Sequence, residues 1–564
     1  MGLDDAPSQS ETQPLLSSEA PSQPFVGTSA SDGAALHRNY DGQGPTCLLA
    51  RHGEAYDNIP QHKRQLGFFS TVFLIFNKII GTGIYATPSI ILRASGSVGV
   101  TLLIWVLGST LAAVGTAVYI ELGTGLPRSG GDKNYLEFMY RRPKYLVTCM
   151  YSIYAFLVGS AGANALVFGE YSLHALALTP SGFNTLVAAV LVLTFCVVMH
   201  GCFLKWGIRL QNALGLFKLV VLSSVAVSGV FCLAGVPGFS VRPEYEVPRN
   251  FEWKNMWNGS GTGANAFVMA LYNVLWSFNG YANANSSLSE IKDPVRTLKR
   301  AAPTAMIFVT FVYMFVNIAY FAVVSKTDIL ESKRIVAALF FRNLFGPTTE
   351  RALSGFIALS VLGNLLSGQF AQARSRLVIQ ELGREGILPK ASFFSSNKPF
   401  NAPLAALVTQ FIVSCAIMLG PPAGDAYLFM VSLSSYSTSL VFTFVSLGLL
   451  LLYTPAYSVW DWDPPYRSPR VVTLIFFLSN VFLVVVPLIP PTTRVYERLP
   501  YWLHPVASLS VSLVGLAYWY IWSVVLPRKY DYKLERVWVM QDDGVSRFAF
   551  RKVSKDISSD QEDS

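Results

Sequence analysis

The sequence carries little charge for its length. Only 14% of its 564 residues are Asp, Glu, Lys or Arg, while 52% are Ala, Val, Ile, Leu, Met, Phe, Trp, Tyr or Cys. Soluble globular chains usually contain about 25% charged residues. The shortage excludes a large disordered protein, a secreted disulfide scaffold and an ordinary cytosolic enzyme. It predicts instead that most of the chain lies in lipid.

Patterns that would bind a metal or perform catalysis are also missing. The six cysteines have no Cys-x-x-Cys spacing and the histidines are scattered, so we expect no zinc site. No Ser/His/Asp set or pair of catalytic carboxylates is evident, and the glycine-rich stretch 258–263 lacks the lysine of a P-loop. The sequence therefore predicts a protein that is not an enzyme and needs no cofactor. It is also expected to bind no nucleic acid, because its net charge of +9 is not gathered into basic clusters with interleaved aromatic residues.

Long apolar segments are what the sequence does contain. A hydrocarbon core about 30 Å thick requires about 20 helical residues, and unbroken apolar runs favour helices over barrel strands. The predicted fold class is an all-α integral membrane protein with twelve transmembrane helices. The predicted spans are 68–92, 98–121, 145–173, 183–204, 210–234, 263–290, 303–324, 352–381, 403–419, 426–453, 471–489 and 503–526.

The basic residues indicate an orientation for these spans. Twelve spans put both tails on one side, and about 30 of the 43 lysines and arginines fall on that side by these boundaries. Lysine and arginine favour cytoplasmic loops, so both termini are predicted to be cytosolic. The sequon Asn258-Gly-Ser260 then falls in an outer loop, as glycosylation requires.

The two tails differ in composition from the spans. Residues 1–66 are rich in Ser, Pro, Gln and Gly and are predicted to form a disordered cytosolic N-tail without a cleaved signal peptide. Residues 67–526 form the transmembrane domain, and 527–564 form a cytosolic C-tail that either docks against the bundle or remains solvated. Residues 11–16 either form an acidic dileucine signal or match one incidentally. Trafficking or ubiquitination machinery is a candidate partner of the tails, and the predicted location is the plasma membrane, with a vacuolar membrane left open.

The first span contains a predicted break. Gly81 and Gly83, with Pro88 downstream, weaken the helix near its middle, because each glycine costs about 1 kcal/mol relative to alanine. An unwound segment there exposes backbone N–H groups at the start of a half-helix, which suits a carboxylate. The alternative is close helix packing through small residues.

The sixth span contains a second predicted break. Small and polar residues are dense between 277 and 287, and aromatic residues flank them. Breaks in the first helix of two successive groups of five are typical of an inverted-repeat transporter. The two breaks together favour a binding site over simple packing.

Four motifs in this order resemble a known family. Residues 79–85 (IIGTGIY) resemble the first-helix GSGIF-type motif of the amino acid–polyamine–organocation superfamily, and 127–131 (PRSGG) resemble its loop after helix 2. Residues 290–296 resemble its E-x-x-(N/D)-P-x-R stretch, and 375–389 resemble its SR…REG-x-LP end of helix 8. Within the superfamily the chain is most similar to the L-type amino acid transporter branch, and there to fungal high-affinity methionine permeases.

The resemblance implies a fold and a substrate site. It implies LeuT-type inverted five-helix repeats with discontinuous helices 1 and 6. The substrate carboxylate is then expected at the amides of Gly81, Thr82 and Gly83. The ammonium is expected near the carbonyls of Ile79, Ile80, Trp276, Ser277 and Asn279, with Tyr281 and Asn283 as further candidates for the pocket. Thr82 and Asn279 depart from the commoner Ser and Gly, while Trp276 matches the position of the outer gate.

Three charged residues are further candidates. Lys218 lies about eight residues, or roughly 12 Å, into the fifth span. The resemblance implies a role in ion coupling for this lysine, because an ammonium replaces sodium in some relatives; the alternative is that Lys218 extends to the cytosol. Glu290 and Arg376 are expected to form an inner-gate salt bridge or a solvated cluster.

The leading hypothesis is a secondary active transporter of neutral L-amino acids, with methionine as the first candidate and protons as the coupling ion. It is expected to work by alternating access in the lipid bilayer. Two alternatives are a nutrient sensor that binds an amino acid with little net transport, and an exchanger of broader specificity.

Overall fold

The computed structural model describes residues 64, 66–158, 161–260, 263–332, 334–374, 383, 386–388, 393–394, 404–460, 462–491, 494–540 and 546–554. The predicted disordered segment 1–66 falls almost wholly outside these residues, as does the dileucine-like motif at 11–16. Arg376 and most of the motif at 375–389 also lie outside them.

The described residues form ten helical segments that are long and apolar enough to cross a membrane. Nine of the helices that build them are α2 (Phe68–Ile79), α5 (Val98–Gly125), α9 (Gly182–Gly201), α10 (Leu204–Leu233), α13 (Pro294–Val323), α16 (Pro347–Arg374), α20 (Ala426–Leu452), α21 (Arg470–Val485) and α22 (Leu503–Tyr520). The tenth segment consists of α7 (Leu146–Val158) and α8 (Gly162–Ala175). The two remaining predicted spans correspond to shorter helices, α12 (Ala264–Ser277) and α19 (Leu404–Leu419).

Shorter elements connect these helices. They are α3 (Gly83–Ala86), α4 (Pro88–Ser95), α6 (Asp132–Met139), α11 (Trp253–Met256), α14 (Lys326–Glu331), α15 (Val336–Phe345), α23 (Leu526–Lys529), and the short helices η4 (Asn283–Glu290), η5 (Pro455–Trp460), η6 (Val486–Leu488) and η7 (Ile521–Val525).

Both predicted helix breaks are present. In the first span, α2 ends at Ile79, and Ile80 adopts extended backbone angles before helical structure resumes at Gly83. In the sixth span, α12 ends at Ser277, and a turn with Gly280 at φ +134° separates it from η4. Only glycine adopts that φ without strain, which explains the residue at position 280.

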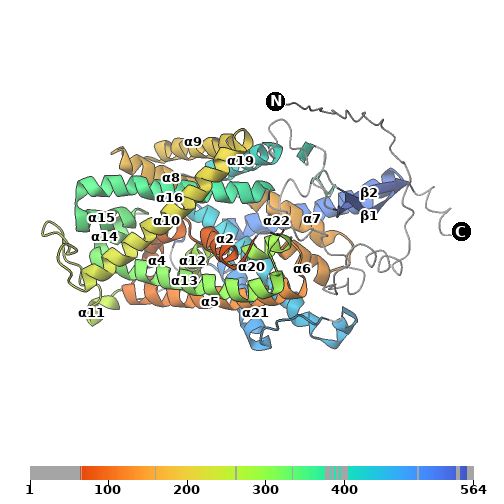
Figure 1. The fold of residues 1–564 in the computed structure, drawn as a ribbon, viewed down its shortest axis with the longest axis horizontal. Coiled ribbons are helices and arrows are strands. Elements are labelled where there is room, and N and C mark those ends of the chain that lie inside the picture. The colour runs from red at the N-terminus through yellow and green to blue at the C-terminus, as the bar shows by residue number, and fades with distance from the viewer. Residues whose placement is uncertain are drawn as a thin grey trace, which may run out of the picture. The chain divides into compact units, whose positions relative to one another are not determined.

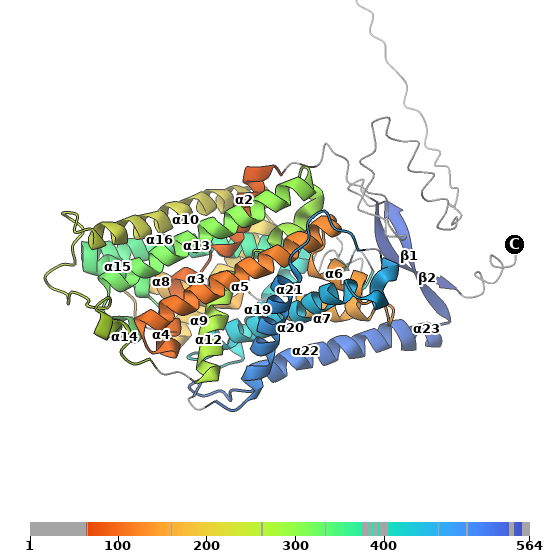
Figure 2. The same cartoon turned by 90° about the horizontal axis from the view of Figure 1, so that it is seen from below.

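The halves of the two broken spans pack in a crossed arrangement. The first half of the first span, α2, packs against α13 and against η4, the second half of the sixth span. The second half of the first span, α4, packs against α12, the first half of the sixth. Figures 1 and 2 show α2, α4 and α12 among the long helices α5, α10 and α13. Each break therefore faces the other.

Two buried carboxylates hold loops against the helices. Glu170 of α8 forms an ion pair with Arg334, whose guanidinium also lies 5.0 Å from the ring centroid of Tyr427. Glu121 of α5 accepts hydrogen bonds from Tyr453, from the indole of Trp462 (3.2 Å) and from the backbone N–H of Ser468 (2.9 Å). Both glutamates thus have the structural pairing that is usual for charges in a membrane protein.

The C-tail contains a β-hairpin that the all-α prediction missed. Strands β1 (Tyr532–Met540) and β2 (Ser546–Ser554) pair antiparallel, with Trp538 opposite Phe548. The hairpin contacts the helical part of the chain, since Tyr145 donates a hydrogen bond to the carbonyl of Leu534 (3.2 Å) and the ring of Phe550 packs edge-on against Tyr145 and Trp522. A short signal of period two was present, since Tyr532 and Leu534 alternate with Lys533 and Glu535, but the prediction treated the whole tail as one charged segment and did not use it.

Candidate functional site

The two breaks meet at Gly83 and Ser277. A Cβ built on Gly83 would overlap the side chain of Ser277 and lie 2.7 Å from its Cα. A second contact follows one turn away, where a Cβ on Gly280 would lie 2.7 Å from Cγ of Lys78 and 3.1 Å from the backbone nitrogen of Ile79. The glycines therefore allow the backbones of the first and sixth spans to approach each other without intervening side chains.

Tyr313 of α13 links the ends of the two half-helices. Its hydroxyl lies 3.0 Å from the carbonyl oxygen of Ile79 and 3.0 Å from that of Ser277. These are the last residues of α2 and α12, where a helix leaves its terminal carbonyls without intrahelical partners. The ring is fully buried and packs edge-on against Trp105 and Phe278.

Lys218 of α10 also binds the end of α2. Its Nζ donates hydrogen bonds to the carbonyl oxygens of Asn77 (2.6 Å) and Ile80 (2.8 Å), and the residue is only 1% exposed. The ammonium thus occupies the C-terminal, partially negative end of a half-helix. The side chain is therefore turned toward α2 and does not extend along α10 toward the membrane surface, as the alternative interpretation of Lys218 required.

Polar side chains from two other helices surround the first break. Thr82 donates a hydrogen bond to Asn164 of α8. A Cβ on Gly81 would overlap the side-chain amide of Asn364 of α16, and Tyr85 lies 3.4 Å from Ser360 of the same helix. The unwound segment is therefore enclosed by α8, α10, α13 and α16.

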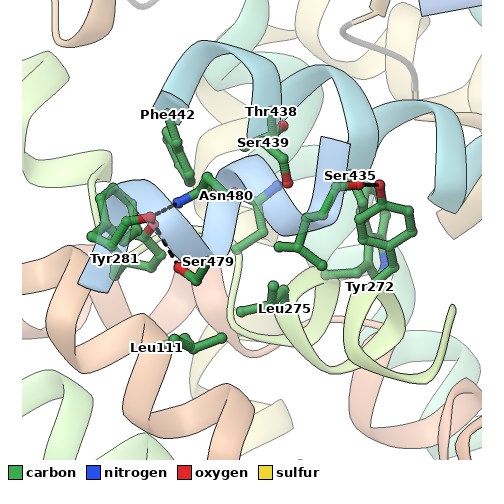
Figure 3. A pocket seen from close by; sticks show the side chains of 14 residues that line it. Leu111, Tyr272, Leu275, Tyr281, Ser435, Thr438, Ser439, Phe442, Ser479 and Asn480 are labelled. Carbon is green, nitrogen blue, oxygen red and sulfur yellow. Dashed lines mark hydrogen bonds between the residues drawn. The ribbon is translucent and has the colours of Figure 1, made fainter. Parts of the chain in front are cut away.

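A pocket opens beside Trp276 of α12. It is lined by residues of α5, α12, α20 and α21 and by the turn after α12 (Figure 3). The predicted site residues Trp276, Asn279 and Tyr281 are among them. The ring of Tyr281 packs against Phe442, with centroids 5.9 Å apart.

The structure thus divides the predicted site residues into three groups. Ile79, Ile80, Gly81, Thr82, Gly83, Ser277 and Lys218 meet at the junction of the two breaks. Trp276, Asn279 and Tyr281 line the pocket. The remaining ones lie apart from both: Asn283 and the exposed Glu290 belong to η4, and Arg376, the expected partner of Glu290, is outside the described residues.

Sequence reasoning missed Tyr313, Asn164 and Asn364. Each is a hydrogen-bonding side chain within an apolar helix, and such residues in a membrane span usually face the interior of the bundle. That signal was available in the sequence. It does not say which partner each residue finds, because the hydrogen-bond partners of Tyr313 and Asn164 lie between 36 and 234 positions away in the chain.

Comparison with known proteins agrees with this arrangement. A family model described as amino acid permease matches residues 66–510. The chain belongs to the amino acid permease family. It is therefore a multi-pass membrane transporter and not an enzyme, which confirms the resemblance drawn from the four motifs.

Several curated relatives are similar to this permease over most of its length. The high-affinity methionine permease of Saccharomyces cerevisiae is 40% identical over 506 residues, which cover 89% of this chain and 86% of the relative. The low-affinity methionine permease of the same yeast is 30% identical and covers 84% and 85%. A b(0,+)-type amino acid transporter 1 of Mus musculus is 28% identical and covers 76% and 83%.

The close approach of the permease's two breaks generates a first prediction. In Gly83→Ala the new methyl group overlaps Ser277, and overpacking of this kind costs about 1–3 kcal/mol. We expect amino acid uptake to fall at least about tenfold at an unchanged amount of protein in the membrane. Gly355→Ala in α16 is the matched control, since its nearest neighbour would be Ala175 Cβ at 3.8 Å. Equal uptake by the two variants would contradict the prediction.

The bridge made by Tyr313 generates a second prediction. Tyr313→Phe keeps the ring but leaves two buried carbonyl oxygens without this donor, a loss of about 1–3 kcal/mol. We expect uptake to fall about tenfold. Tyr320→Phe on the same helix is the control, because the buried Tyr320 hydroxyl has no hydrogen-bond partner among the described residues. Uptake assays of both variants in whole cells test this, and an unimpaired Tyr313→Phe variant would refute it.

Proposed function

We propose that this permease carries neutral L-amino acids, with methionine as its main substrate, by alternating access coupled to protons. The observation that supports the proposal best is the junction where the breaks of the first and sixth spans meet at Gly83 and Ser277. Two opposed half-helix ends at one point suit a zwitterion, because the start of a helix attracts a carboxylate and the end of a helix attracts an ammonium.

In this proposal the backbone performs the recognition. The carboxylate binds the amides of Gly81, Thr82 and Gly83, which precede or begin the second half-helix. The ammonium binds carbonyls at the ends of α2 and α12, near Ile79, Ile80, Trp276, Ser277 and Asn279. The carbonyls of Ile79 and Ser277 share the hydroxyl of Tyr313, which aligns them toward one point.

The fold proposed for this mechanism has twelve spans in LeuT-type inverted repeats. The crossed packing of α2 with η4 and of α4 with α12 supports the repeat, because a two-fold relation between the broken spans exchanges their halves in this way. In this arrangement α12 with η4 forms the sixth crossing and α19 forms the ninth.

The substrate assignment rests on the relatives. The two yeast relatives are named high-affinity and low-affinity methionine permeases, and the former is the more similar of the two at 40% identity. The second candidate function is an exchanger of broader specificity, because relatives at 27–28% identity include a b(0,+)-type amino acid transporter of Mus musculus and a cystine/glutamate transporter of Homo sapiens, whose names are not those of methionine permeases.

Lys218 is proposed to take the place of a sodium ion. Its ammonium donates hydrogen bonds to two carbonyl oxygens at the end of α2. Carbonyl oxygens are also the type of ligand that a bound sodium ion would use. Loss and return of the Lys218 proton would then loosen and restore the end of α2 during the cycle. Glu290 and Arg376 are proposed as an inner-gate pair. We place both termini in the cytosol and the permease in the plasma membrane, with tails available to trafficking or ubiquitination machinery.

Uptake of labelled methionine tests the function directly. In proteoliposomes that contain only this permease, we expect saturable uptake that responds to an inward proton gradient and is unchanged when sodium is replaced by potassium. Uptake that requires an amino acid inside the vesicle would favour the exchanger. Binding without flux would favour a sensor, and the absence of both would refute the proposal.

The role of Lys218 predicts a difference between two lysines of α10. Lys218→Met removes the ammonium from two buried carbonyls, and the loss of such a charged hydrogen bond, worth about 1.5–3 kcal/mol, should lower uptake at least about tenfold. The remaining uptake should no longer respond to the proton gradient. Lys205→Met, at the exposed start of the same helix, should leave both rate and gradient response unchanged. A Lys218→Met variant with a normal proton response would exclude Lys218 from coupling.

A further inference from the structure

Asp132 is a partly buried carboxylate that the proposed transport mechanism does not use. It is the first residue of α6, the short helix between α5 and α7, and the hydroxyl of Tyr119 on α5 donates a hydrogen bond to it. Among the described residues no lysine, arginine or histidine forms an ion pair with it, and its neighbours Lys133 and Glu137 pair with each other (3.9 Å). The charge of Asp132 is thus met by a hydroxyl and not by a counter-ion.

Tyrosine side chains surround this carboxylate. Five of them lie within range of its charge: Tyr119 of α5, Tyr135 of α6, Tyr151 and Tyr154 of α7, and Tyr281 in the turn after α12. Helix α20, which also packs against α6, contains no charged residue and presents the ring of Phe442 to Tyr119 (5.6 Å between centroids). Arg128, in the loop before α6, lies within range of Tyr135, and Glu121 of α5 binds the loop after α20 instead. Asp132 is therefore surrounded mainly by hydroxyl groups and aromatic rings.

This environment favours the neutral carboxyl group. Burial raises the pKa of Asp132 to about 6, from about 4 for an aspartate in water, and the hydrogen bond from Tyr119 opposes the increase. The group is then ionised at neutral pH and takes up a proton as the pH falls through about 6. Hydrogen bonds to an ionised acceptor are roughly twice as strong as those between neutral groups, so a bound proton weakens the link between Asp132 and Tyr119.

Tyr119 connects this carboxyl group to the segment after the second break. Its carbonyl oxygen accepts a hydrogen bond from the side-chain amide of Asn285 in η4 (2.6 Å), and the same amide lies 2.8 Å from the hydroxyl of Tyr135 in α6. Its ring packs edge-on against that of Tyr281, with centroids 5.9 Å apart. One residue of α5 therefore contacts Asp132 with its hydroxyl, η4 with its carbonyl and the turn after α12 with its ring.

Asp132 lies where two sets of helices meet. Helix α6 packs against α7 and α20, while Tyr119 and Asn285 belong to α5 and η4. Figures 1 and 2 show α6 at the same end of the helices as the hairpin of β1 and β2, which is the end that the proposed function places in the cytosol. A weaker link at Asp132 thus acts on the broken sixth span from the cytosolic side.

We propose that Asp132 is a proton-binding site reached from the cytosol, and that a proton bound there slows transport by weakening the attachment of η4 to α5 and α6. The proton adds to the carboxylate and gives a neutral carboxyl group, and no other bond forms or breaks. Asp132 is a positioning residue, because it acts through Tyr119, and it is separate from Lys218, which binds the end of α2. The inference rests on the proposed function, since it takes α6 to face the cytosol and methionine to be carried.

The internal pH of proteoliposomes tests the proposal. With the tails of the permease inside, methionine uptake is measured at one external pH and at internal pH values on both sides of 6. Asp132→Asn is neutral at every pH and still accepts from Tyr119 through its amide oxygen, so it imitates the protonated group. We expect the unaltered permease to exceed this variant about fivefold at internal pH well above 6 and to equal it well below 6. Both proteins experience the same gradient, so its effect on the driving force cancels in the ratio.

Tyr119→Phe provides a second test that a folding defect cannot imitate. It removes the hydrogen bond that lowers the pKa of Asp132 and keeps the ring that packs against Tyr281. We expect the internal pH of half-maximal uptake to move upward, whereas a general loss of structure would reduce uptake at every pH without moving this midpoint. Asp463→Asn is the matched control, because Asp463 is an exposed aspartate that pairs with Arg467 (2.6 Å) in the loop after α20.

The outcomes separate this inference from the proposed function. If the ratio of unaltered to Asp132→Asn uptake is the same at every internal pH, or if Tyr119→Phe leaves the midpoint in place, the inference is overturned. If both change as expected while Asp463→Asn behaves like the unaltered permease, the inference is supported. If the unaltered permease takes up no methionine, the proposed function fails first and this inference fails with it.

Discussion

The close approach of the first and sixth spans at Gly83 and Ser277 is the constraint on which the site depends. A Cβ at position 83 would overlap Ser277, so the two half-helix ends face each other only because that atom is missing. Breaking a helix in lipid leaves backbone groups that must find partners inside the protein, since no water is available to them. The rest of the site supplies those partners.

Two helices outside the broken spans, α10 and α13, provide partners for these backbone groups, and a third, α8, binds a side chain of the first break. Lys218 of α10 binds the carbonyls of Asn77 and Ile80, Tyr313 of α13 bridges Ile79 and Ser277, and Asn164 of α8 accepts from Thr82. The broken segments are therefore held from outside and need no regular hydrogen bonding of their own. In the proposed alternating access, movement of any one of these helices would change the contacts that hold the junction.

The breaks themselves were predictable because they depend on local composition. Glycine at positions 81, 83 and 280 destabilises a helix whatever the tertiary structure around it, so both helix breaks can be recognised from the sequence. The side chains that support the two breaks were harder to predict from the sequence. Nothing near Tyr313 in the sequence indicates that its hydroxyl reaches two carbonyls, one of them 234 positions away. The hairpin of β1 and β2 was missed for a different reason, because its alternation of apolar and polar residues is short and lies in a tail that composition marked as polar.

By itself the sequence determined the membrane location of the chain, the approximate limits of its helices, the two breaks and the family. These follow from apolar run lengths, from glycine and from short motifs, all of which act over a few neighbouring residues. Tertiary structure alone decided that Lys218 binds the end of α2, that Asn283 and Glu290 lie apart from the junction, and that a neutral pocket opens beside Trp276. These features depend on which faces of the helices pack against each other. Packing between distant segments leaves no periodic signal in the sequence.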